Sequence, residues 1–211
     1  MNGLFISIEG VEGVGKSTNH QFVCDYLTEL GHEVVATREP GGTPEAEKIR
    51  ELLLDKDNIL DATTEALLMF ASRREHIIRV IRPALESGKS VVTDRFVDAS
   101  FAYQGGARQL GFDTIMTLES LVLDGLKPDL TLLLDLDVEE GLKRLGKRGE
   151  PDRIEKENRD FFVTVRDAYL RRAQNEPERI RQVDASGSLK QVQTHIAQTL
   201  DNFLKGHGKA N

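Results

Sequence analysis

The sequence has a single cysteine, Cys24, no tryptophan and only 6 prolines in 211 residues. One cysteine cannot form an internal disulfide bond, and the amino terminus lacks a basic region followed by an apolar secretory stretch. No apolar run approaches the roughly 18 residues that a membrane-spanning helix needs. We therefore expect a soluble protein of a reducing, cytoplasmic compartment, with no membrane partner and no role for Cys24 beyond packing.

Basic residues are also in deficit. The chain has 28 Lys and Arg against 35 Asp and Glu, a net charge of -7. A surface that coats nucleic acid needs a surplus of basic residues, so we expect no nucleic-acid partner. Any anion that the protein binds must meet a local cluster of cations.

The order of apolar segments indicates the fold class. Short apolar runs predict five strands, at Leu4 to Glu9, Val34 to Thr37, Val91 to Thr93, Leu130 to Leu136 and Ile180 to Val183. Helical patterns separate them, including about Pro44 to Leu54 and about Thr64 to Ser87, the latter broken or kinked at Pro83. Parallel strands need crossovers of this length. The pattern predicts an α/β fold, a five-stranded parallel sheet with helices on both faces, whose ligands bind at the carboxyl ends of the strands. With no linker-like composition, residues 1–211 are expected to form one domain.

A glycine-rich segment follows the first strand directly. Residues 10–17 fit the pattern G-x-x-x-x-G-K-[ST], and a helix to about Leu30 follows them. Glycines let the backbone turn its amides around a polyphosphate, and the helix start adds partial positive charge. Lys16 is expected to reach the β and γ phosphates and Ser17 to bind Mg²⁺. The residues assigned to ATP are Gly10, Val11, Glu12, Gly13, Val14, Gly15, Lys16, Ser17 and Thr18.

Several classes of nucleotide-binding protein fit less well. A GTPase-type switch needs an N-K-x-D segment, which is absent, and the D-x-x-G match at 184–187 follows the last strand. A large motor or transporter ATPase usually needs a longer chain. Phosphoryl transfer to a small molecule is favoured, while a nucleotide-dependent switch or binding protein without phosphotransfer stays open.

Four further blocks carry a resemblance to a known family. They are Glu12 within the loop, Arg38-Glu39-Pro40-Gly41-Gly42-Thr43, Asp94-Arg95 and Tyr103-Gln104-Gly105-Gly106. Together, and over nearly the whole chain, the sequence resembles the bacterial thymidylate kinases. The resemblance implies a P-loop nucleotide-kinase fold that phosphorylates dTMP to dTDP with ATP and Mg²⁺, in dTTP biosynthesis. It also implies a homodimer, with helices such as Thr64 to Ser87 and Thr114 to Leu126 at the interface. Another small nucleotide or nucleoside kinase on the same fold is the nearest alternative.

We expect the molecule that accepts the phosphoryl group to bind around the end of the third strand. An arginine in that crevice, beside a phosphate loop, suits bidentate phosphate recognition. The resemblance implies that Arg95 binds the acceptor phosphate and takes part in catalysis, that Asp94 lies near the metal, and that Arg38 contacts the substrate.

Two residues on one predicted helix are expected to hold the base. Arg74 falls on an apolar stripe with Leu67 and Ile78, and Phe70 lies one turn before it. Thymidylate kinases hold thymine with such an F-x-x-x-R pair, whereas the residues alone fit a core phenylalanine and a snorkelling arginine.

The family also implies contacts to the sugar and base. Tyr103 packs against the deoxyribose, Gln104 and Ser100 belong to the same substrate-binding set, and Glu12 lies near the 3′-hydroxyl. The family commonly has the sequence D-S-S where this chain has Asp98-Ala99-Ser100, so one hydroxyl is missing here.

A basic segment after the fourth strand resembles the family's lid, placed at about 144–156. Transfer between two phosphates needs cations that neutralise the growing charge, and Arg148 and Arg153 are the candidates, with Lys16 and Arg95. No general base is needed, because the second pKa of a phosphate monoester is about 6. The resemblance places Asp184, Ala185 and Ser186 at the adenine, although an ordinary loop fits that segment nearly as well.

Overall fold

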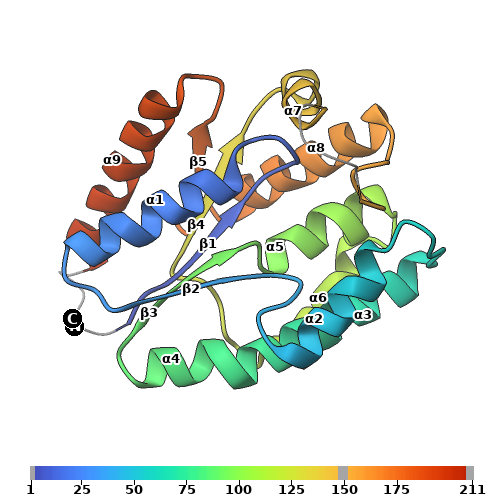
Figure 1. Ribbon diagram of the computed structural model, residues 1–211, viewed down its shortest axis with the longest axis horizontal. Coiled ribbons are helices and arrows are strands. Elements are labelled where there is room, and N and C mark those ends of the chain that lie inside the picture. Colours follow the sequence, from blue (N-terminus) through green and yellow to red (C-terminus); the bar gives the residue numbers. More distant parts are fainter. Residues whose placement is uncertain (1–2, 147–151, 208–211) are drawn as a thin grey trace.

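A parallel sheet forms the centre of the protein (Figure 1). The computed structural model describes residues 3–146 and 152–207. Its strands are β1 (Phe5–Glu9), β2 (Val34–Arg38), β3 (Ser90–Asp94), β4 (Leu130–Asp135) and β5 (Ile180–Asp184), in the order β2-β3-β1-β4-β5. Every neighbouring pair is parallel. The predicted α/β class and five-stranded parallel sheet are confirmed.

Helices cover both faces of this sheet (Figure 1). Two helices, α1 (Lys16–Glu29) and α9 (Leu189–His207), pack together on one face. The other elements are α2 (Pro44–Leu54), α3 (Ala62–His76), η1 (Ile77–Ile81), α4 (Arg82–Glu86), α5 (Val97–Ser100), η2 (Phe101–Ala107), α6 (Phe112–Leu123), α7 (Val138–Leu145) and α8 (Arg159–Asn175). No helix within 3–146 or 152–207 combines the length and apolar character that a bilayer crossing requires.

The helix predicted to be broken or kinked at Pro83 continues past that residue. Between α3 and α4 the backbone widens into the π-helical turn η1, which immediately precedes Arg82 and Pro83. Proline lacks an N–H donor and clashes with the carbonyl four residues earlier, here that of Arg79. A wide turn relieves this conflict without ending the helix.

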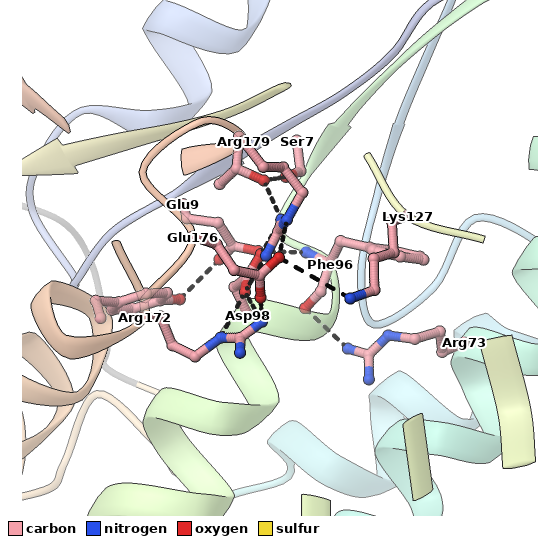
Figure 2. A network of polar contacts seen from close by, with 11 residues as sticks. Ser7, Glu9, Arg73, Phe96, Asp98, Lys127, Arg172, Glu176 and Arg179 are labelled. Atoms are coloured by element: carbon pink, nitrogen blue, oxygen red, sulfur yellow. Dashed lines mark hydrogen bonds and ion pairs between the residues drawn. The ribbon is translucent and has the colours of Figure 1, made fainter. Parts of the chain in front are cut away.

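A buried ionic network ties the middle of the fold together (Figure 2). Asp98 in α5 is 1% exposed and accepts hydrogen bonds from Arg172 in α8, at 3.0 Å, and from Arg179, at 2.7 and 2.9 Å. Arg179 also donates to Glu176 at 2.8 Å. Because each charge has an opposite partner, the network joins α5, α8 and the start of β5 without leaving an ion unpaired.

The Asp98→Ala substitution should destabilise the protein strongly, because Arg172 and Arg179 then lose the buried carboxylate that they share and keep only the partly exposed Glu176. We expect the free energy of unfolding, measured by urea denaturation, to fall by about 3–5 kcal/mol. The control is Glu178→Ala, whose pair with Arg181 is exposed and of a kind that contributes less than about 1 kcal/mol. Equal losses in the two variants would contradict this role for the network.

Candidate active site

The glycine-rich loop between β1 and α1 has a backbone conformation that requires glycine at several positions. Gly10, Gly13 and Gly15 all have positive φ, at 141, 77 and 88°. A Cβ on Gly13 would lie 2.0 Å from the carbonyl oxygen of Gly141 in α7, so only glycine fits there. The Lys16 Nζ donates to the carbonyls of Gly10 and Val11 at 3.1 and 2.9 Å, which holds the ammonium inside the loop.

A cavity of about 250 Å³ opens beside this loop. Its walls come from the loop and the start of α1, from the ends of β2 and β3, from α2, α3, α5 and η2, and from Asp152, Ile154 and Glu155. Of the sequence-predicted residues, it is lined by Glu12, Gly13, Gly15, Lys16, Ser17, Arg38, Asp94, Arg95, Ser100, Tyr103 and Gln104. Segments far apart in the sequence thus meet where the parallel strands end.

Arg95 occupies the centre of this wall. It has a left-handed backbone, with φ 69°, which is unusual for a residue with a side chain. Its Nη2 contacts a Glu12 carboxylate oxygen and donates to the Tyr103 hydroxyl at 3.1 Å. Burial alone would raise the pKa of Glu12, but Arg95 and Lys16, with the Tyr103 hydroxyl, lower that pKa to about 2. Glu12 is therefore ionised and compensates both cations.

Asp94 and Ser17 form the part of the cavity that suits a cation. The Asp94 Oδ1 is buried and has no hydrogen-bond partner among the described residues, and Ser17 lies exposed in the first turn of α1. Within the described ranges, no three His, Cys, Asp or Glu side chains gather as a metal site of their own. This arrangement fits Mg²⁺, which is usually held by one or two carboxylates together with phosphate oxygens.

The pair predicted to hold the base is corrected by the structure. Phe70 is 1% exposed in the core and does not line the cavity, and Arg74 is exposed and donates to the Val122 carbonyl at 2.9 Å. The part of the apolar stripe next to Arg74 lies on the surface, since Leu67 and Ile78 are 53% and 41% exposed. The assignments of Phe70 and Arg74 to the substrate are therefore wrong.

The residues one position earlier, Met69 and Arg73, line the cavity instead. Arg73 is buried, and its guanidinium donates to Glu39 Oε2 at 2.7 Å, to Ser100 Oγ at 3.0 Å and to the Phe96 carbonyl at 3.0 Å. A guanidinium has five N–H groups, so two remain for a ligand. The inward face of this helix could have been found in the spacing of Ala66, Phe70, Arg73 and Ile77, all of which are buried.

Glu39 fixes Arg73 from the loop after β2. Its Oε1 lies 3.0 Å from the His76 Nδ1, and the His76 Nε2 lies 2.7 Å from the Thr37 hydroxyl. Glu39 and Arg73 are 3% and 2% exposed in their side chains, so this is a buried pair. Glu39 belongs to the block from Arg38 to Thr43 that carries the family resemblance, but neither Glu39 nor Arg73 was among the predicted site residues.

Of the two arginines predicted in the lid, only Arg153 belongs to the residues that the structure describes. Arg148 lies outside the described residues, so its assignment stays a prediction. Arg153 does not line the cavity; it donates to Glu65 Oε2 and to the Leu53 carbonyl, both at 2.8 Å. In this arrangement a buried carboxylate holds the charge of Arg153, and its catalytic contact stays a prediction. Asp152 and Ile154 beside it do line the cavity.

The remaining ATP assignments are not placed on the cavity wall. Val11 and Val14 are buried in the core, and Thr18 is exposed in the first turn of α1. Asp184 is the last residue of β5, and Ala185 and Ser186 follow it. Arg144 donates to the Ala185 carbonyl at 3.3 Å. The contact of residues 184–186 with adenine stays a prediction.

Glu9, the last residue of β1, is a buried carboxyl beneath the site (Figure 2). It accepts hydrogen bonds from the Phe96 amide and the Tyr169 hydroxyl, both at 2.7 Å. Burial, with the nearby charge of Asp98, raises the pKa of Glu9 from 4.5 to about 8. Glu9 is therefore largely protonated at neutral pH, so the interior gains no further negative charge.

This raised pKa predicts a pH dependence of stability. The folded protein binds the Glu9 proton more tightly, so the stabilisation is complete below about pH 4.5 and is lost as pH rises through about 8. Across this window the free energy of unfolding should fall relative to the Glu9→Gln variant, by at most about 1.4 kcal/mol per pH unit. Denaturant titrations at several pH values check this, and parallel curves for the two proteins would contradict it.

Comparison with known proteins agrees with this geometry. A family model described as thymidylate kinase matches residues 8–196. The chain is 58% identical to a thymidylate kinase of Chromohalobacter salexigens, over 96% of this chain and 97% of that protein. It is 53% identical to a thymidylate kinase of Ectopseudomonas mendocina, over 97% and 98%. A crystal structure of thymidylate kinase from Ehrlichia chaffeensis superimposes with a TM-score of 0.79, at 32% identity, over 95% of this chain and 100% of that one.

Fold and site together define a P-loop phosphotransferase, in which the phosphate loop and a group of arginines border one cavity. The matches narrow this class, because they extend over almost the entire chain. The chain belongs to the thymidylate kinase family.

Proposed function

We propose that the protein transfers the γ-phosphoryl group of ATP to dTMP, producing ADP and dTDP. The observation that supports this most directly is the cavity itself, which joins the phosphate loop to two arginines, Arg95 and Arg73. One cation is then available for the acceptor phosphate and the other for the base. Phosphoryl transfer requires donor and acceptor to be held in line at close distance.

The donor binds at the phosphate loop. The backbone amides of the loop and the start of α1 attract the phosphates, and Lys16 exchanges its present carbonyl partners for the β and γ oxygens. Ser17 and Asp94 hold Mg²⁺ together with the nucleotide. When bound, the ion neutralises phosphate charge and polarises the transferring group.

The acceptor binds between Arg95 and Arg73. Arg95 leaves Glu12 to pair with the 5′-phosphate, which provides a bidentate partner. Tyr103 packs beside the sugar, and Met69, Ser100 and Gln104 surround the base. The two free N–H groups of Arg73 donate to a base carbonyl.

The transfer needs no protein base, because the acceptor oxygen is already largely deprotonated at neutral pH. Lys16 and Arg95 bracket the moving group and neutralise its charge. Arg148 is proposed as a further cation of the lid, placed at about 144–156. Arg38, which pairs at 2.9 Å with Glu47 on the cavity rim, adds a cation near the acceptor.

A homodimer is proposed from the exposed apolar side chains. Leu67 on α3 and Ile78 on η1 lie on a surface, as do Met116 and Leu121 on the adjacent α6. Apolar groups gathered on neighbouring helices are typical of an interface. Sedimentation equilibrium would measure whether the protein forms this dimer. We also propose that the protein is cytoplasmic.

An acceptor panel tests the activity. With ATP and Mg²⁺, we expect the highest kcat/KM for dTMP, compared with deoxyuridylate, cytidylate, adenylate and thymidine. Formation of dTDP and ADP in equal amounts is followed by chromatography. A higher kcat/KM for another acceptor would reject the proposed substrate, and release of phosphate without a phosphorylated acceptor would indicate a nucleotide-dependent switch instead.

Neighbouring arginines provide a matched test of base recognition. Arg73→Lys keeps the charge but loses the planar set of donors, so kcat/KM for dTMP should fall by roughly 10- to 100-fold. Arg74→Lys should change it less than about 3-fold, because Arg74 contacts only the Val122 carbonyl at the surface. The KM for ATP should hardly move in either variant. Equal effects of the two substitutions would indicate that Arg74 also takes part in binding dTMP.

A further inference from the structure

Glu65, in the first turn of α3, has no place in the chemistry described above, although it is 1% exposed. Its Oε1 accepts a hydrogen bond from the Gln104 Nε2 at 2.8 Å, and its Oε2 accepts one from the Arg153 Nη2 at 2.8 Å. The Arg108 Nε lies 3.3 Å from Oε2. One buried carboxylate therefore joins three segments that are distant in the sequence.

On one side, Glu65 anchors the turn that follows the undescribed part of the lid. Arg153 also donates from Nε to the Leu53 carbonyl at 2.8 Å and from its backbone N to the Leu54 carbonyl at 3.3 Å. The next residues form a compact turn, in which Asp152 Oδ1 accepts from the amides of Ile154 and Glu155 at 2.9 Å each. Since Arg153 fastens this turn to the end of α2, its side chain keeps Asp152 and Ile154 in the cavity wall.

On the other side, Glu65 holds a residue of the acceptor wall. Gln104 is 1% exposed and lines the cavity together with Ser100 and Arg73. A carboxylate only accepts hydrogen bonds, so Glu65 selects the orientation of the Gln104 amide that turns its nitrogen toward α3. A ligand at this wall consequently meets an amide held in one orientation.

The charges around Glu65 are balanced. Arg108 pairs with Glu157 at 2.6 Å as well as with Glu65, so two guanidinium groups face two carboxylates. Removing the charge of Glu65 alone leaves Arg108 and Arg153 with only Glu157. The partner that has no second carboxylate in this cluster is Arg153, and its anchoring should weaken most.

We propose that Glu65 is a positioning residue that couples acceptor binding to docking of residues 152–157. This inference rests on the proposed function, with dTMP as the acceptor. A nucleotide that fixes Gln104 also fixes the Glu65 carboxylate, and the fixed carboxylate holds Arg153 more firmly. Because coupling between two binding events is reciprocal, docking of the turn raises the affinity for dTMP in return.

The test is Glu65→Gln, which keeps the shape of the side chain but not its charge. We expect the KM for dTMP to rise about 10-fold while the KM for ATP changes less than about 2-fold, the result of losing charge-assisted hydrogen bonds on the acceptor side only. Hydrogen exchange of the 152–157 amides, measured by mass spectrometry, should slow when dTMP binds the wild-type protein. Saturating dTMP should not slow it in Glu65→Gln.

The matched control is Glu75→Gln on the same helix, which breaks an exposed pair with Arg79 and should change neither KM nor exchange. If Glu65→Gln does not fold, Arg153→Gln tests the other end of the contact and should raise the KM for dTMP in the same way. In the double variant the two effects should not add, because both substitutions remove the same contact.

Three results would overturn the coupling: slower exchange with dTMP in Glu65→Gln as in wild type, additive effects in the double variant, or equal increases in the KM for dTMP and for ATP. Failure of the proposed function looks different. In that case the wild-type protein itself would show no saturable binding of dTMP by calorimetry, and the coupling would be rejected with it.

Discussion

Most arginines at or beside the cavity are held by a carboxylate, and the rest of the site depends on this pairing. A buried guanidinium without a partner would cost several kcal/mol. Glu39 holds Arg73, Glu12 holds Arg95, and Glu65 holds Arg153. The same rule applies deeper in the molecule, where Asp98 holds two arginines. The protein can therefore keep cations ready for anionic ligands without losing the stability of its interior.

The parallel sheet makes this pairing possible. Its strands all end at one edge, so Glu12 after β1, Glu39 after β2 and Arg95 after β3 meet across long stretches of sequence. An anion that enters competes with a carboxylate already in place, and Glu12, with its low pKa, is ionised at any physiological pH. Binding at Arg95 is thus an exchange of partners, and selectivity depends on how well the ligand replaces Glu12.

The sequence alone was sufficient for the sheet, the phosphate loop and the family. Apolar runs mark buried parallel strands clearly, and the glycines of the loop are required by backbone geometry at Gly10, Gly13 and Gly15. It was harder to predict from the sequence which face of a helix points inward. Successive residues on a helix point about 100° apart, so mistaking the exposed stripe of Leu67 and Ile78 for the inner face exchanged Arg73 for Arg74. The Glu65 contact with Arg153 joins residues 88 positions apart, and no local pattern records it.

The left-handed backbone of Arg95 has a consequence for the evolution of thermal tolerance in this protein. A side chain at φ 69° costs about 1 kcal/mol or more relative to glycine, which adopts that conformation freely. Glycine at this position would remove the strain, yet the replacement would delete the guanidinium that pairs with Glu12 and contacts Tyr103. Heat-adapted descendants must therefore gain their stability elsewhere in the chain.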